Sequence, residues 1–344
     1  MKKRLPVILF ILFHMVFVST VIADTDLTPL YRELEVLFDE IGKDTAPHLQ
    51  NYGLMMEGTG AAEIGPHFFF SFSAGSAFMP GILTFRAGDS PFKILPVGKL
   101  LDEQVPSEGI LYDIYKLSET FFLNPGARLS LGIGFENGLE FFAHFGIIPQ
   151  FAVDLVVPLI PTEGLENLTF NRLNAGVRVR KVLMSDYQAF PAVSLNAGYT
   201  YTRFDAAVDT LDALPISGFE FSGYQLDLSG ALAFKTSMHT AGIELAVSKK
   251  LAFFVPFLRL GAWQQWTSYS AGISGLTITM NKEGEVPITV IGRDPLAEQV
   301  ITDLSFIPAG GFELQLGKMS FILLGSYNTA SGSAAADLSL QFRI

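Results

Sequence analysis

The sequence contains no cysteine, only five histidines, and fewer basic than acidic side chains. A chain without cysteine has no disulfide framework and no thiol to carry the lipid of a lipoprotein. The formal net charge of -11 argues against nucleic acid as a partner, because nucleic-acid binding relies on a basic surface. The sequence also lacks the common motifs of serine hydrolases, zinc proteases and phosphate-binding loops. We therefore expect no cofactor, no bound metal and no enzymatic activity.

The first residues predict export from the cytoplasm. A basic start over residues 2–4 precedes an apolar stretch over residues 5–18, and a small-residue cleavage pattern follows at residues 21–23. The apolar stretch is shorter than the roughly 20 residues that a membrane-spanning helix needs. We expect residues 1–23 to be a cleaved signal peptide, with Asp24 as the first mature residue.

Downstream of the signal, no apolar run has membrane-spanning length, although 49% of all residues are hydrophobic and the mean hydropathy is +0.36. Residues 27–41 repeat apolar side chains at helical spacing, and Gly42 is the predicted end of that helix. We expect residues 24–63 to form a short helical segment that plugs a larger domain. The helical repeat consists of Leu27, Leu30, Leu34, Leu37, Phe38 and Ile41.

From residue 64 onward, apolar side chains alternate with polar or small ones, which predicts strands. Residues 129–135 and 139–147 are examples, and Asn137-Gly138 between them is a strong hairpin signal because both turn positions need a positive φ. The second face is rich in Gly, Ser, Thr and Asn with occasional charges, which favours an outer-membrane barrel over a soluble β-sandwich. Further alternating runs lie at 68–78, 173–180, 193–201, 224–228, 243–247, 258–262 and 312–316.

The strand pattern predicts an all-β fold, a transmembrane antiparallel β-barrel over residues 64–344. The strands approach the 9–11 residues that a tilted membrane strand needs. An even strand number gives about 12 strands with both ends of the chain in the periplasm, or about 14 strands if residues 84–122 hold a further hairpin. The smaller number requires one strand within residues 271–300. Aromatic side chains near strand ends are expected to form the interfacial girdles, namely Phe253, Phe254, Trp263, Trp266 and Tyr269.

The last strand carries Ala336, Leu338, Leu340, Phe342 and Ile344 on one face. An apolar terminal strand with an aromatic residue near its end resembles the assembly signal of outer-membrane barrels. We therefore expect the outer membrane as the location, with membrane lipid and the outer-membrane assembly machinery as partners. A barrel must close on itself because lipid cannot satisfy an open strand edge, so this strand is predicted to close it.

The polar strand faces predict the lumen. Mixed charges there have two interpretations, either ion pairs that hold the lumen shut or a ladder that orients a polar head group or ions. Predicted luminal charges include Glu136, Asp227, Glu313 and Asp337. The candidate ligand-binding residues are Arg128, Glu140, Phe142, His144, Arg178, Arg180, Arg259 and Trp263.

Two further features bear on function. His144 near Glu140 suggests an acid–base pair, although the sequence identifies no nucleophile or metal partner for it. The predicted outer regions 95–101, 110–114 and 211–221 are unusually apolar. Such loops either pack against themselves as a cap or capture a hydrophobic solute.

The signal, plug segment, strands, apolar outer loops and terminal strand together resemble the long-chain fatty-acid transporters (FadL-like) and their distant relatives. That family has an Asn-Pro-Ala motif near its mature N-terminus, whereas here Asn124-Pro125-Gly126 lies far downstream, so we transfer no functional residue. The resemblance implies a monomeric, partly plugged barrel that passively takes up or binds a small hydrophobic solute such as a fatty acid. The alternatives are a structural or adhesive surface barrel without transport, and a barrel-embedded hydrolase.

Overall fold

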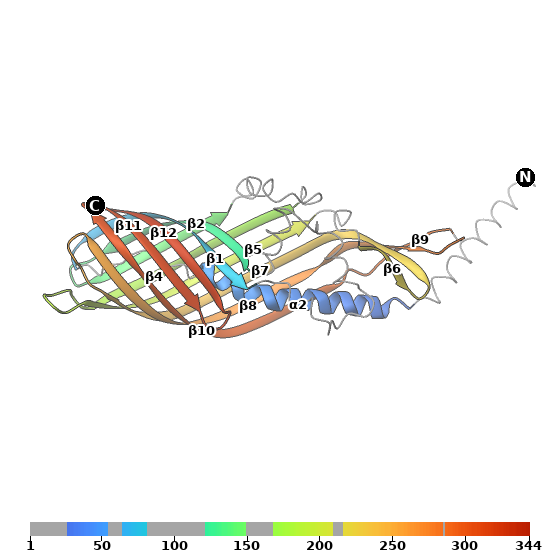
Figure 1. Cartoon of the computed structure of the whole chain (residues 1–344), viewed down its shortest axis with the longest axis horizontal. Helices are drawn as coiled ribbons and strands as arrows, with labels where there is room; N and C mark the ends of the chain where they lie inside the picture. Colours follow the sequence, from blue (N-terminus) through green and yellow to red (C-terminus); the bar gives the residue numbers. More distant parts are fainter. Residues whose placement is uncertain (1–25, 54–63, 81–120, 149–167, 209–215, 285) are drawn as a thin grey trace, which may run out of the picture.

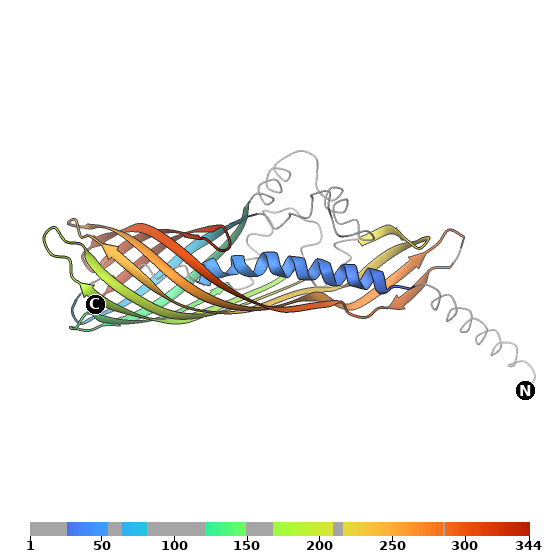
Figure 2. The ribbon, with the colours of Figure 1, turned by 90° about the horizontal axis from the view of Figure 1, so that it is seen from below.

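The computed structural model describes residues 26–53, 64–80, 121–148, 168–208, 216–284 and 286–344. It is a closed antiparallel barrel with one helix, α2 (Thr28–Gly53), that runs parallel to the long direction of the barrel (Figures 1 and 2). The strands are β1 (His67–Pro80), β2 (Phe121–Gly134), β3 (Leu139–Ile148), β4 (Leu168–Met184), β5 (Ala192–Val208), β6 (Ile216–Phe221), β7 (Tyr224–Ser248), β8 (Phe254–Asn281), β9 (Ile288–Ile291), β10 (Leu296–Leu316), β11 (Met319–Asn328) and β12 (Ser333–Arg343).

The ring consists of ten of these strands. Its order is β1-β2-β3-β4-β5-β7-β8-β10-β11-β12, and β12 pairs with β1 to close it. The predicted closing role of the last strand is thus confirmed. The strands β6 and β9 lie outside the ring, where they pair with the far ends of β7 and β8.

The prediction of about twelve ring strands is therefore only partly right. Twelve strands occur in the described part of the chain, but two of them do not take part in the ring. The segment 276–279, counted with 288–290 as one barrel strand, is the far end of β8, which continues unbroken from Phe254 to Asn281. The further hairpin that residues 84–122 would add lies almost wholly outside the described residues.

One end of the barrel carries the short connections, at 135–138, 185–191, 249–253 and 317–318. Gly138 in the first of them has a φ of 73°, as predicted, but Asn137 is not among the residues with a positive φ, so the expectation for both turn positions is only half right. The start of β1 and the end of β12 lie at this same end (Figure 1). Single-chain outer-membrane barrels have short turns in the periplasm and long loops outside, so this end corresponds to the periplasmic end of such barrels and is called so below.

The outward-facing side chains change along the barrel. On the face made by β5, β7, β8 and β10, the rows near the periplasmic turns are aliphatic, as for Leu195, Leu245 and Leu260, which stand side by side. Further from the turns, Tyr201, His239, Trp266 and Thr302 form one cross-strand row. An aliphatic band bounded by aromatic residues matches the lipid-facing surface of a membrane barrel.

The girdle prediction is wrong for Trp263 and Tyr269. Their side chains are 0% and 3% exposed and point into the barrel, whereas that of Trp266 is 42% exposed on the outside. Trp263 and Trp266 are three positions apart on one strand, so the alternation of a strand places them on opposite faces.

A substitution at Leu131 can test which face of β2 meets the lipid. Its side chain is exposed on the outer wall, whereas neighbouring Ser130 is buried inside. We expect Leu131→Arg to destabilise the membrane-inserted barrel by roughly 2–4 kcal/mol, because Arg is costly in the bilayer, and Leu131→Ala to have much less effect. The folded fraction after refolding into lipid vesicles, seen as the faster band on unheated gels, measures this. Glu136→Arg, at an exposed turn position, is the matched control, and an equal loss there would contradict the assignment.

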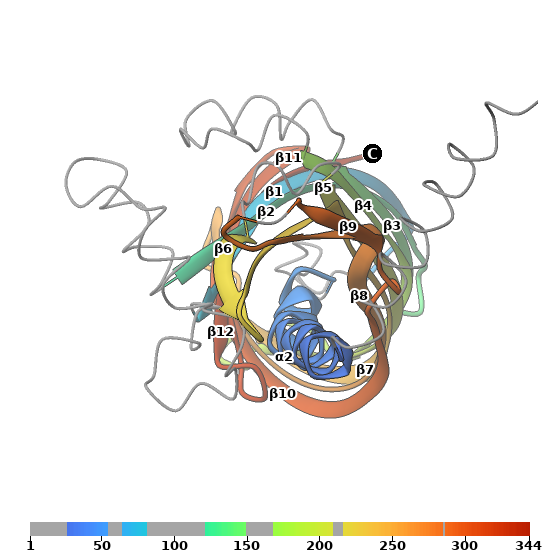
Figure 3. The same cartoon turned by 90° about the vertical axis from the view of Figure 1, so that its right-hand side faces the viewer.

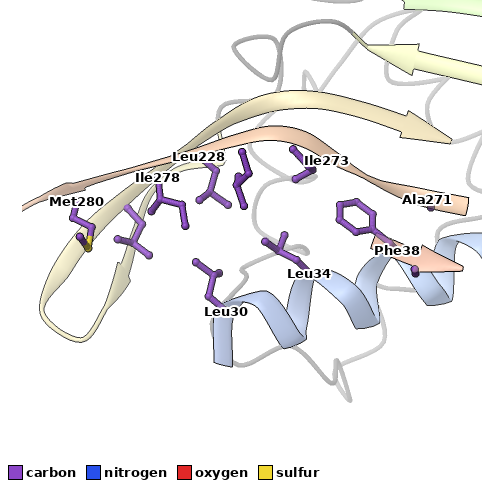
Figure 4. Packing of buried hydrophobic residues seen from close by; sticks show 11 residues of the cluster. Leu30, Leu34, Phe38, Leu228, Ala271, Ile273, Ile278 and Met280 are labelled. Atoms are coloured by element: carbon purple, nitrogen blue, oxygen red, sulfur yellow. The ribbon is translucent and has the colours of Figure 1, made fainter. Parts of the chain in front are cut away.

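Beyond the ring, the far ends of β7 and β8 together with β6 and β9 form a four-stranded sheet, here called the extension. The first half of α2 packs on it through Leu30, Leu34 and Phe38 (Figure 4). These side chains meet Leu228 and Ile278 of the extension, among others, and all are buried. Strand residues 224–228, expected to meet lipid, therefore cover a helix instead.

Helix α2 continues past the predicted end at Gly42 as far as Gly53. A Cβ atom at Gly42 would lie 2.0 Å from Cε2 of Tyr269, so glycine lets the helix approach the wall closely. The Tyr269 hydroxyl donates a hydrogen bond to Asp39 Oδ1 at 2.7 Å. The second half of α2 lies inside the ring (Figure 3). No helix in the described ranges is both long and apolar enough to cross a membrane.

The apolar outer regions are largely not described. Residues 95–101 and 110–114, and Leu211 and Leu214 of the third region, lie outside the described residues. The rest of the third region is β6 rather than a loop, and it pairs with β7. Phe221 at its end packs against the α2 cluster, which favours a self-packed cap at this place over an exposed patch.

Candidate functional site in the barrel lumen

The lumen is lined by every second residue of each ring strand. All eight candidate ligand-binding residues are buried there, on β2, β3, β4 and β8. Alternation fixes this arrangement, because their sequence neighbours Leu129, Phe141, Val177 and Leu258 are exposed on the outer wall. The inward orientation that the sequence predicted for these eight side chains is confirmed. The prediction is wrong for two other luminal charges. Glu136 is exposed in a turn, and Asp227 is on the extension.

Glycines on the inward face make room for the large luminal side chains. A Cβ atom at Gly132 would lie 2.1 Å from the Phe69 ring and 2.9 Å from that of Phe142. One at Gly242 would lie 2.7 Å from the indole of Trp263. The glycines on the inward face of the strands therefore leave room for aromatic and arginine side chains in the lumen.

Glu140 is the centre of a buried ion-pair group. It accepts a hydrogen bond from Nε of Arg180 at 2.6 Å, and Nη2 of the same arginine also contacts it. Its other oxygen lies 3.5 Å from Nε2 of His67. Glu140 and Arg180 stand directly opposite each other in the β3–β4 register. Burial of both side chains strengthens their attraction and makes the loss of either partner costly.

Two more carboxylates bind arginines within the lumen. Glu244 accepts a hydrogen bond from Asn196 at 2.8 Å and lies 3.8 Å from Nη1 of Arg259. Glu313 accepts a hydrogen bond from Arg343 at 2.9 Å. Glu244 and Arg343 are not among the candidate residues predicted from the sequence, although both occupy inward positions of alternating runs.

Asp337, a predicted luminal charge, lies on the β12 side of the lumen. It accepts a hydrogen bond from Ser339 at 2.7 Å, and the Ser339 hydroxyl also bonds to Ser73 on β1. Arg128 and Arg259 both lie within electrostatic range of its carboxylate.

The surroundings of Arg178 combine an aromatic ring with guanidinium nitrogens that lack a hydrogen-bond partner. Its guanidinium lies 5.0 Å from the centre of the Trp263 ring, and Nε and Nη2 are buried without a hydrogen-bond partner in the described residues. Arg128 likewise has buried Nε and Nη1 atoms with no such partner. Buried N–H donors that lack acceptors cost free energy, and a guanidinium readily binds a carboxylate or phosphate through two parallel hydrogen bonds.

Comparison with protein-family models finds no match, and comparison with curated proteins finds none either. Solved structures do match. The outer-membrane protease OmpT of Escherichia coli is 7% identical with a TM-score of 0.37, over 85% of this chain and 100% of that one. The translocator domain of the autotransporter NalP of Neisseria meningitidis is 9% identical with a TM-score of 0.35, over 86% and 92%. The monoaromatic hydrocarbon channel CymD is 9% identical with a TM-score of 0.22, over 82% and 88%.

These neighbours are outer-membrane β-barrels.

In the lumen, Glu140 and His144 do not form the acid–base pair that their spacing suggested. Glu140 binds Arg180 and His67, while Nε2 of His144 lies 3.5 Å from the Thr200 hydroxyl. No group of three or more His, Asp or Glu side chains suited to a metal ion occurs in the described part of the chain. The luminal cluster is thus chemically suited to binding an anion and an apolar group, by arginine and aromatic side chains.

Proposed function

We propose that the protein is a monomeric outer-membrane barrel that passively takes up or binds a small hydrophobic solute with an acidic head group, such as a fatty acid. The observation that carries this proposal is Arg178. Its guanidinium lies over the buried Trp263 ring and has two nitrogens, Nε and Nη2, without a hydrogen-bond partner among the described residues. Arg180, Arg259 and Arg343 each face a carboxylate.

The chemistry of the surrounding side chains fits an amphipathic solute. A carboxylate bound to Arg178 would gain charge-assisted hydrogen bonds in a site shielded from water. Phe69 and Phe142, whose rings are 5.1 Å apart, offer an apolar contact for a chain beside it. The helix α2 is the movable element in this proposal, because it fills the ring between the outside and the arginines.

Arg178→Ala is expected to weaken oleate binding by detergent-solubilised protein about tenfold or more, since a hydrogen bond to a charged group contributes about 1.5–3 kcal/mol. Oleyl alcohol, which lacks the carboxylate, should bind both proteins equally. Calorimetric titration measures the two affinities, and uptake into vesicles measures transport. Arg203→Ala, on the outer wall, is the matched control. Unchanged oleate affinity in Arg178→Ala would contradict the proposal.

A structural or adhesive surface barrel is the second candidate. It is favoured by the three buried ion pairs of the lumen and by α2 inside the ring, because both fill the space that a solute would cross. This function predicts no oleate binding, no co-purified fatty acid and no single-channel conductance from refolded protein.

A further inference from the structure

A polar groove lies on the outer wall of the barrel, above the lipid-facing band. It has a volume of about 720 Å³ and is formed by β5, β7, β8 and β10. Its first cross-strand row is Arg203, Ser237, Ser268 and Val300, and its second is Asp205, Lys235, Ser270 and Glu298.

The height of the groove relative to the bilayer can be inferred from the cross-strand rows between it and the periplasmic turns. The row next to it holds Tyr201, His239, Trp266 and Thr302, and the rows nearer the periplasmic turns are mostly aliphatic. Aromatic residues of membrane barrels lie at the boundary between hydrocarbon and head groups. The groove is therefore at the height of the outer-leaflet head groups, on the surface that lipid surrounds.

The charges of the groove are of both signs. Arg203 donates a hydrogen bond through Nε to Asp205 at 2.8 Å, and its side chain remains largely exposed. Lys235 stands between Asp205 and Ser270 in register, is exposed, and has no hydrogen-bond or ion-pair partner among the described residues. An unpaired ammonium at this height is placed to meet the phosphate of a lipid.

We propose that this groove holds the phosphorylated sugar head group of an outer-leaflet glycolipid. Lys235 and Arg203 bind the phosphate, since ammonium and guanidinium groups form charge-assisted hydrogen bonds with it. The carboxylates of Asp205 and Glu298 would repel a phosphate but accept hydrogen bonds from sugar hydroxyls, as Ser237 and Ser270 also can. The mixed charge therefore favours a phosphorylated sugar over a simple phospholipid. The acyl chains would continue along the aliphatic rows below.

The test uses the folded full-length protein in detergent, titrated with diphosphorylated lipid A and, separately, with phosphatidylglycerol. Native mass spectrometry measures the bound fraction. We expect lipid A to bind more tightly than phosphatidylglycerol, and Lys235→Met to weaken lipid A binding at least fivefold. Removing both phosphates from lipid A should weaken its binding to the wild type to a similar extent.

Lys318→Met, in an exposed turn at the opposite end, is the control and should bind lipid A like the wild type. The unheated gel band verifies that each variant is folded. Unchanged lipid A binding by Lys235→Met would overturn the proposal, and so would equal binding of phosphatidylglycerol. Neither result depends on the luminal arginines, so oleate binding by the same proteins remains a separate measurement.

Discussion

Deleting Leu340–Ile344 is expected to abolish the folded barrel. These residues supply the end of β12, whose register with β1 pairs Phe72 with Leu340 and Phe69 with Arg343. The backbones of Phe68 and Ile344 also exchange two hydrogen bonds, of 3.0 and 2.8 Å. Without them β1 and β11 face hydrocarbon with unpaired backbone groups, each of which costs several kcal/mol there. The folded fraction after refolding into vesicles should fall to near zero.

Refolding without any assembly machinery isolates this cause from a lost assembly signal. The double variant Leu340→Ala, Phe342→Ala is the control, because it keeps the backbone pairing and removes only outward side chains. We expect it to refold in vesicles with reduced yield. If the truncated chain refolds as well as this control, β12 does not close the barrel.

Glu140→Ala is expected to lower the free energy of unfolding by about 3–5 kcal/mol, because it leaves Arg180 buried without its carboxylate. Both side chains are almost completely buried, so solvent screens the pair little. Urea unfolding in lipid vesicles, followed by tryptophan fluorescence, measures the change.

Glu136→Ala, four positions earlier in an exposed turn, is the matched control and should change stability by less than about 0.5 kcal/mol. Glu140→Gln keeps the shape and should lie between the two, since the amide oxygen still accepts a hydrogen bond from Arg180. Equal effects of Glu136→Ala and Glu140→Ala would show that the luminal pair does not stabilise the barrel.

The alternation of strands made much of the fold predictable. A slip of one residue would turn every apolar side chain of a strand from lipid to lumen, so the pattern fixes the inward face strongly. This explains why Arg128, Phe142 and Arg178 could be placed in the lumen from the sequence alone. The hairpin at Asn137-Gly138 was predictable for a local reason, because glycine readily adopts the positive φ that Gly138 has.

The errors arise where an apolar face meets protein rather than lipid. Residues 276–280 resemble a membrane strand, but their apolar side chains cover α2 outside the ring. Gly42 resembles a helix end, but it permits the contact with Tyr269. Both contacts join segments that are far apart in the sequence. The spacing of apolar residues within one segment cannot predict such contacts.

The candidate site was predictable as a set of residues but not as a set of contacts. Glu140 faces Arg180 because of the β3–β4 register, and the alternation of each strand does not set the register between the two strands. The place of Arg178 over Trp263 joins β4 to β8, two strands that are not neighbours in the ring. Such contacts depend on the closure of the ring.

The enclosure of α2 has a consequence for the order of folding. The helix precedes β1 in the chain, and the seam between β1 and β12 completes a wall around its second half (Figure 3). The seam joins residues such as Ser73 and Ser339, 266 positions apart, and such long-range closure is entropically costly and slow. If the seam formed first, α2 would have to thread into a finished ring. The simpler route lays α2 against β8 and β10 while the sheet is still open, so that the last pairing traps the helix inside.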